Sequence, residues 1–148
     1  MTQTKPAQLH QTAAATFEDL ALLIPLDFLE EEQRELPLTD GVVVRFFGPM
    51  TGRLELRVSE RIPRVVAENM LGIEEPSEQL QRDAFGELAN VLTGNLLSTM
   101  TNAVGVFHLR PPTKIAPEMG AEIPAAEASL GLEEGRVNTR LYITLGGH

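Results

Sequence analysis

The chain has 148 residues, no cysteine and a formal net charge of −9. Its length suits a single domain, and its core must be largely aliphatic, because 43% of the residues are hydrophobic but only 5% are aromatic. Without thiols, disulfides, cysteine nucleophiles and thiolate metal sites are excluded. The acidic balance, with no cluster of lysine and arginine, argues against nucleic-acid binding.

Hydrophobic stretches in the sequence are too short to cross a bilayer, so we expect no membrane insertion. Residues 1–11 are polar and lack the basic and then apolar order of a secretory signal. We therefore expect a cytoplasmic protein with one domain over residues 1–148. Within it, residues 1–15 are predicted to form a flexible or loosely helical N-terminal extension.

The first predicted helix begins at Thr16, because residues 16–19 have the form of a capping box that opens an apolar segment. Pro25 should kink or stop this helix, which can resume over residues 26–33. Pro37 and the pair Asp40-Gly41 then indicate a turn.

Residues 41–58 predict a β-hairpin. The first arm, 41–47, is rich in β-branched and aromatic residues, and residues 48–52 have the composition of a turn. The second arm, 53–58, alternates strictly between charged and apolar side chains. The apolar face holds Leu54, Leu56 and Val58, and the charged face holds Arg53, Glu55 and Arg57.

Two helices are expected next. Ser59 and Glu60 are predicted to cap a helix that tolerates Pro63 in its first turn and ends at Gly72. Its apolar stripe is Ile62, Val65, Val66 and Met70. After an acidic linker, Ser77 is predicted to cap a long helix that ends near residue 100.

The C-terminal part predicts strands around a proline-rich loop. A strand over residues 104–110 stops at two prolines, and the loop 111–124 has room for a short edge strand near Ile115. Residues 128–132 and 137–145 form a final hairpin. The whole order of elements predicts an α+β fold, a two-layer sandwich of an antiparallel sheet with helices on one face.

The long helix has two distinct faces. Its apolar stripe comprises Phe85, Leu88, Ala89, Leu92, Leu96 and Thr99. The opposite face collects Asp83, Glu87, Asn90, Gly94, Leu97, Ser98 and Thr101. Glu87 and Asn90 are three residues apart and therefore neighbours on that outer face.

Gly94 stands centrally on the outer face, although a glycine costs roughly 1 kcal/mol relative to alanine inside a helix. With Leu97 predicted to point outward beside it, the face has the character of a docking surface. Taken alone, however, a Glu and an Asn on a solvated helix are ordinary. A plain polar surface with an incidental glycine therefore stays open as an alternative.

The segment from Asp83 to Asn95, Asp-Ala-Phe-Gly-Glu-Leu-Ala-Asn-Val-Leu-Thr-Gly-Asn, resembles the signature helix of the CheX-like chemotaxis phosphatases, relatives of CheC and FliY. That family has Glu-x-x-Asn followed four residues later by Gly-Asn. A looser likeness extends over most of residues 17–145. The chain has one such motif, because Val66 and not a glutamate stands three residues before Asn69.

The resemblance implies a phosphatase that hydrolyses the phosphoaspartate of a CheY-like response regulator. Carried over by position, Asn90 orients the attacking water and Glu87 engages a lysine of the regulator. The remaining docking surface is expected at Asp83, Gly94, Leu97 and Ser98. The resemblance implies no cofactor of the protein's own, since the phosphorylated receiver domain is expected to hold the Mg²⁺.

Further expectations concern partners and metals. A non-catalytic receiver-binding or flagellar-switch-like assembly module of the same fold is the alternative function. A homodimer is expected, through the sheet edge formed by residues 137–145. No metal site is expected, because His10, His108 and His148 lack the spacing of metal ligands.

Overall fold

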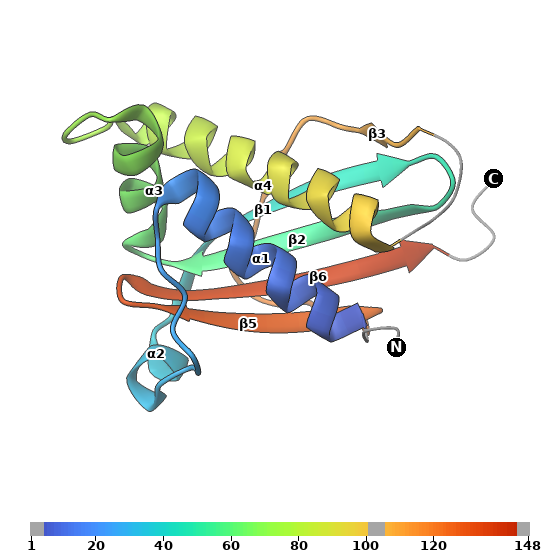
Figure 1. The fold of residues 1–148 in the computed structure, drawn as a ribbon, viewed down its shortest axis with the longest axis horizontal. Coiled ribbons are helices and arrows are strands. Elements are labelled where there is room, and N and C mark those ends of the chain that lie inside the picture. The colour runs from blue at the N-terminus through green and yellow to red at the C-terminus, as the bar shows by residue number, and fades with distance from the viewer. Residues whose placement is uncertain (1–4, 101–105, 145–148) are drawn as a thin grey trace.

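The chain folds into one antiparallel sheet with its long helices on one face, as Figure 1 shows. The computed structural model describes residues 5–100 and 106–144. In chain order, the elements are α1 (Lys5–Ala21), α2 (Glu31–Glu35), β1 (Leu38–Phe47), β2 (Thr51–Ser59), α3 (Ile62–Leu71), α4 (Glu78–Met100), β3 (His108–Leu109), β4 (Thr113–Ile115), β5 (Ala126–Leu132) and β6 (Gly135–Thr144). The predicted α+β class is confirmed.

The strand order is β3-β1-β2-β6-β5, and β4 also pairs with β1. Both predicted hairpins are confirmed, as β1 with β2 and β5 with β6. The expected free edge at residues 137–145 is wrong over the described range, because β6 pairs with β2 on one side and β5 on the other. A homodimer therefore needs another surface.

The core lies between the sheet and helices α1, α3 and α4. Alternation along β2 places Leu54, Leu56 and Val58 in this core, as predicted. Helices α1 and α4 cross the sheet side by side (Figure 1). Helix α4 packs against α1 and α3 and also contacts β1, so its position relative to the sheet edge is fixed.

Helix α1 begins much earlier than the sequence indicated. It runs from Lys5, and Leu9 and Ala13 are buried in the core, so residues 5–15 are not an extension. Thr16 lies inside the helix, where its hydroxyl donates to the Thr12 carbonyl at 2.7 Å instead of capping. Helix α1 ends at Ala21, before Pro25, with Leu22 in the left-handed region at φ 59°.

The second predicted cap, Ser59, is also wrong. Ser59 is the last residue of β2, and its buried hydroxyl accepts a hydrogen bond from the Arg136 N–H at 3.0 Å. Helix α3 then starts at Ile62 with Pro63 in its first turn, as expected. It ends at Gly72, whose φ of 65° favours glycine.

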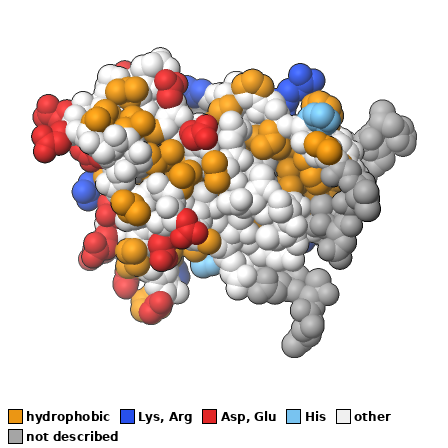
Figure 2. Space-filling model, turned by 45° about the horizontal axis from the view of Figure 1, so that its top comes forward, with side chains coloured by type: hydrophobic (Ala, Val, Ile, Leu, Met, Phe, Trp, Pro, Cys, Tyr) orange, Lys and Arg blue, Asp and Glu red, His pale blue; other side chains and the backbone are white. Residues whose placement is uncertain are grey.

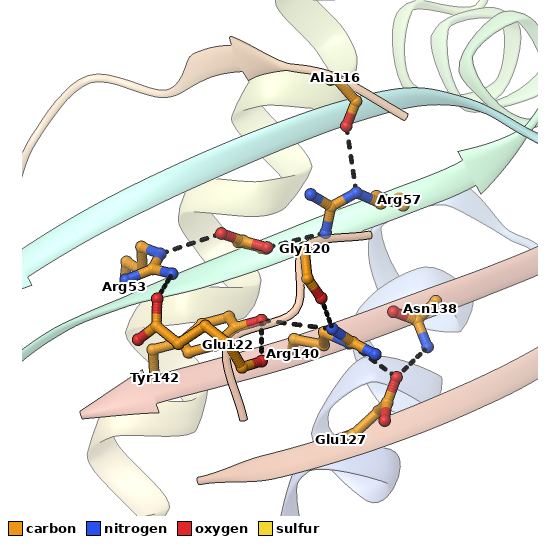
Figure 3. A network of polar contacts seen from close by, with 10 residues as sticks. Arg53, Arg57, Ala116, Gly120, Glu122, Glu127, Asn138, Arg140 and Tyr142 are labelled. Atoms are coloured by element: carbon orange, nitrogen blue, oxygen red, sulfur yellow. Dashed lines mark hydrogen bonds and ion pairs between the residues drawn. The ribbon is translucent and has the colours of Figure 1, made fainter. Parts of the chain in front are cut away.

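The outer face of the sheet is polar and covered by part of the proline-rich loop (Figure 3). Arg57 donates to the Ala116 carbonyl at 3.1 Å and pairs with Glu55 at 2.8 Å. Farther along the loop, Arg53 pairs with Glu122 at 2.8 Å and Arg140 donates to the Gly120 carbonyl at 3.0 Å. The charged face predicted for β2 therefore holds the loop in place.

Candidate functional site

Helix α4 positions the candidate site. The hydroxyl of Ser77 accepts the Leu80 N–H at 3.2 Å, which confirms the predicted cap. Five of the six predicted stripe residues are buried: Phe85, Leu88, Ala89, Leu92 and Leu96. Thr99 is exposed instead. The buried stripe fixes how far the helix is rotated, and thereby which residues its first half turns away from the core.

A cleft of about 580 Å³ lies between this half of α4 and the sheet edge formed by β1 and β4. Its charged and amide side chains come mostly from α4, with one acid from β1 and one lysine from β4. They are Asp40, Glu78, Gln79, Gln81, Arg82, Asp83, Glu87, Asn90 and Lys114. The structure thus brings Asp83, Glu87 and Asn90 to one wall of a single cleft.

Glu87 and Asn90 differ in their surroundings. The side chain of Glu87 is exposed, whereas Asn90 is half-buried. The Asn90 Oδ1 atom is shielded from solvent and has no hydrogen-bond donor among the residues that the structure describes. Leaving a buried acceptor unpaired costs roughly 1–3 kcal/mol, so such an atom calls for a functional explanation.

Gly86 brings the opposite wall close to α4. A Cβ atom added at Gly86 meets Pro112 Cγ at 3.0 Å, so a larger residue there crowds the proline. Pro112 precedes β4, which pairs with β1 through Thr113, Lys114 and Ile115. The absent side chain of Gly86 therefore sets the width of the cleft.

Of the four residues expected on the docking surface, only Asp83 lines the cleft, and Gly94, Leu97 and Ser98 lie elsewhere. Leu97 is buried in the core at 2% exposure, so its predicted outward orientation is wrong. It belongs to the same core cluster as Leu92 and Leu96, so the outer face of the second half of α4 is narrower than predicted. Ser98 lines a separate groove between α1 and α4 and donates to the Gly94 carbonyl at 3.0 Å.

Gly94 is half-buried and does not line the cleft. A Cβ atom added there meets no described residue within 4 Å. Thr101, placed on the same face from the sequence, lies outside the described residues. Asn69, the other asparagine considered, donates to the Ala21 carbonyl at 2.7 Å. It therefore ties α3 to the end of α1.

Sequence reasoning missed Asp40, Pro112 and Lys114, which reach the cleft from β1 and from the segment around β4. They lie far from the α4 motif in sequence, so helix periodicity could not find them. One signal in the sequence pointed to this wall of the cleft. Gly86 lies within a helix, and Pro111 and Pro112 precede the short edge strand expected near Ile115.

Other observations bear on metals and membranes. No group of three His, Asp or Glu side chains in residues 5–100 and 106–144 is arranged to hold a metal ion. The His108 ring stacks on Phe47, with ring centroids 5.0 Å apart. Among the described helices, none is long and apolar enough to cross a membrane.

Acidic and hydrophobic side chains gather at the end of the molecule where α3 connects to α4 (Figure 2). The exposed acids of this connection and of the first turn of α4 are Glu74, Glu75 and Glu78, and the exposed apolar residues are Leu71, Ile73 and Leu80. The acidic character of the cleft thus continues along the surface.

Residues 41–130, more than half of the chain, match the family described as chemotaxis phosphatase CheX. The chain therefore belongs to the CheX family. A search of the curated proteins gave no match.

Solved structures support the same fold. A CheX chemotaxis protein from Desulfovibrio desulfuricans superposes with a TM-score of 0.69 at 14% identity, over 95% of this chain and 99% of that one. The CheX–CheY–BeF₃–Mg²⁺ complex from Borrelia burgdorferi gives a TM-score of 0.62 at 18% identity, over 93% and 96%. The FliM middle domain from Vibrio alginolyticus gives 0.53 at 11%, over 95% and 90%.

Proposed function

We propose that this protein accelerates hydrolysis of the phosphoaspartate of a CheY-like response regulator in the cytoplasm. The observation that carries the proposal is the Asn90 amide at the wall of a cleft beside exposed Glu87. Its buried oxygen has no donor within residues 5–100 and 106–144. Membership of the CheX family and the solved complex of a Borrelia CheX with CheY support this reading.

The proposed chemistry needs little from this chain. An acyl phosphate is already activated, and the receiver domain is expected to supply the Mg²⁺ that balances charge on the phosphoryl oxygens. A water oxygen attacks phosphorus, the bond from phosphorus to the aspartate oxygen breaks, and phosphate leaves the restored carboxylate. The water's protons pass to the phosphate and to solvent.

In this scheme, Asn90 places the water in line with the departing carboxylate. An amide donates and accepts hydrogen bonds without titrating near pH 7, which suits orientation better than proton abstraction. In the complex, the Asn90 amide turns so that its Oδ1 atom, shielded from solvent in the free protein, accepts a hydrogen bond from the water. Glu87, exposed on the same wall, docks to a lysine of the receiver and holds the two proteins in register.

The alternative is a receiver-binding or assembly module without turnover. The fold is compatible with it, since the FliM middle domain and the FliY protein of Thermotoga maritima share the fold at TM-scores of 0.53 and 0.54. The Glu87–Asn90 arrangement favours the enzyme, because assembly alone has no use for a partnerless buried amide oxygen.

The lifetime of each phosphorylated receiver from the source organism, measured with and without this protein, separates the two functions. A phosphatase shortens the lifetime of at least one receiver at substoichiometric concentrations. Measurable receiver binding with an unchanged lifetime contradicts the proposal and favours the binding module.

A further inference from the structure

The cleft has a second wall whose chemistry differs from that of α4. Lys114 on β4 is paired in register with Val42, which lies in the core on the helix-covered face of the sheet. Directly paired residues project from the same face of a sheet. The exposed Lys114 side chain therefore rises on the α4 side, where it lines the cleft opposite Glu87 and Asn90.

The position of Lys114 is fixed by backbone contacts. Strand β4 is held by three register pairs with β1, and Pro112 packs against Gly86 of α4. Lys114 thus lies on a strand held by pairing with β1, two residues after Pro112, whose contact with Gly86 sets the width of the cleft. The backbone at Lys114 therefore needs no rearrangement when a partner binds, and only the side chain loses freedom.

Negatively charged side chains outnumber positively charged ones along the cleft. Four carboxylates line it, from Asp40, Glu78, Asp83 and Glu87, against two cations, Arg82 and Lys114. Arg82 donates to Gln79 at 3.1 Å. Within the described ranges, the Lys114 ammonium has neither a hydrogen bond nor an ion pair with another residue.

We propose that Lys114 is a docking residue for the phosphorylated receiver, opposite Glu87. This inference rests on the proposed function, since it names how the same cleft recognises its partner. A phosphorylated carboxylate carries nearly two negative charges at neutral pH, and a cleft lined mostly by acids repels it. A free ammonium on the far wall offsets that repulsion and draws the phosphorylated form in preference to the unphosphorylated one.

The chain offers a matched control, because it has two lysines and the other, Lys5, is exposed at the start of α1 and outside the cleft. Lys114→Gln and Lys5→Gln remove the same charge. With a CheY-type receiver of the source organism phosphorylated by acetyl phosphate, we expect Lys114→Gln to raise KM about three- to tenfold with kcat within twofold. Lys5→Gln should leave both constants unchanged.

Binding is measured separately in the Asn90→Ala background, where the phosphorylated receiver persists. Adding Lys114→Gln should weaken binding of the phosphorylated receiver by the same factor, flatten its salt dependence, and leave the unphosphorylated receiver unaffected. Equal KM and affinity for the Lys114 and Lys5 variants overturn the inference. A lowered thermal midpoint with unchanged KM also overturns it, because Lys114 is then structural.

Failure of this inference is distinguishable from failure of the proposed function. If wild-type protein accelerates hydrolysis but Lys114→Gln behaves like Lys5→Gln, only the role of Lys114 is wrong. If wild-type protein does not accelerate hydrolysis, the proposed function is wrong, and the binding measurements still decide whether Lys114 recognises the phosphorylated form.

Discussion

A buried amide oxygen without a donor destabilises a folded protein unless something outside the chain supplies the donor. Two such atoms occur in the described part of this chain, Asn90 Oδ1 and Asn138 Oδ1. The Asn138 amide nitrogen is anchored to Glu127 at 3.0 Å under the outer loop. Asn90 has no hydrogen bond through its amide to any described residue, and it lines a cleft. Under the proposed function, a water bound in the receiver complex is the donor.

Glu87 is predicted to act in binding of the receiver domain and not in the chemical step. Under the proposed function, the exposed carboxylate of Glu87 docks to a lysine of the receiver, so Glu87→Ala should raise the apparent KM more than it lowers kcat. Steady-state phosphate release at varied receiver concentrations measures both constants. Glu18→Ala, an exposed glutamate of α1 outside the cleft, is the control. A loss confined to kcat refutes the docking role.

At the scale of single elements, helix α4 could be predicted almost completely from the sequence. Its cap at Ser77, its length and five residues of its buried stripe follow from local patterns. Leu97 could not be placed, because its burial depends on packing against elements distant in sequence, which helix periodicity does not show. The start of helix α1 could not be predicted from the sequence. Its early core positions are Leu9 and Ala13, and two such residues give only a weak helical periodicity.

Two glycines of α4 should respond in opposite ways to the same substitution. A Cβ atom at Gly94 meets nothing within 4 Å in the described part of the chain, so Gly94→Ala should raise the free energy of unfolding by about 0.5–1 kcal/mol. At Gly86 the new methyl group meets Pro112 Cγ at 3.0 Å, so the same helix-propensity gain is reduced or reversed. Urea unfolding measures the difference, and equal stabilisation of both variants contradicts the contact.

For the whole molecule, the class of fold followed from the order of elements, but the strand order did not. Nothing local in residues 137–145 indicates that β6 runs between β2 and β5. Because strand pairing could not be predicted, only the wall of the cleft formed by α4 could be predicted from the sequence. The α4 wall is periodic in sequence, whereas Asp40 and Lys114 reach the other wall through pairing of β1 with β4.

The ion pairs of Glu55 with Arg53 and Arg57, on the outer face of β2, should make stability depend on acid pH. Burial alone raises the pKa of Glu55, but hydrogen bonds from Arg57 and Arg53 outweigh burial and hold that pKa below its usual value. The resulting stabilisation is fully present above the pH where an unfolded glutamate titrates, about 4.3, and is lost as pH falls through the lower folded pKa.

Glu55→Gln should therefore lower the free energy of unfolding by about 1–2 kcal/mol at pH 7 and make its decline below about pH 4.3 shallower. Urea unfolding at a series of pH values measures both effects. Glu122→Gln, which removes the more exposed partner of Arg53, should have a smaller effect. Identical pH profiles for wild type and Glu55→Gln contradict the role of this ion pair.

The whole account depends most directly on the Asn90 amide. The decay of a phosphorylated receiver is measured with wild-type protein, with Asn90→Ala and with Asn95→Ala. Asn95 is an asparagine of the same helix that contacts Thr16 of α1 at 3.4 Å, away from the cleft. We predict that Asn90→Ala loses an acceleration of about 10²–10⁴ while Asn95→Ala retains it. A folded Asn90→Ala variant as fast as wild type contradicts the proposed function of this site.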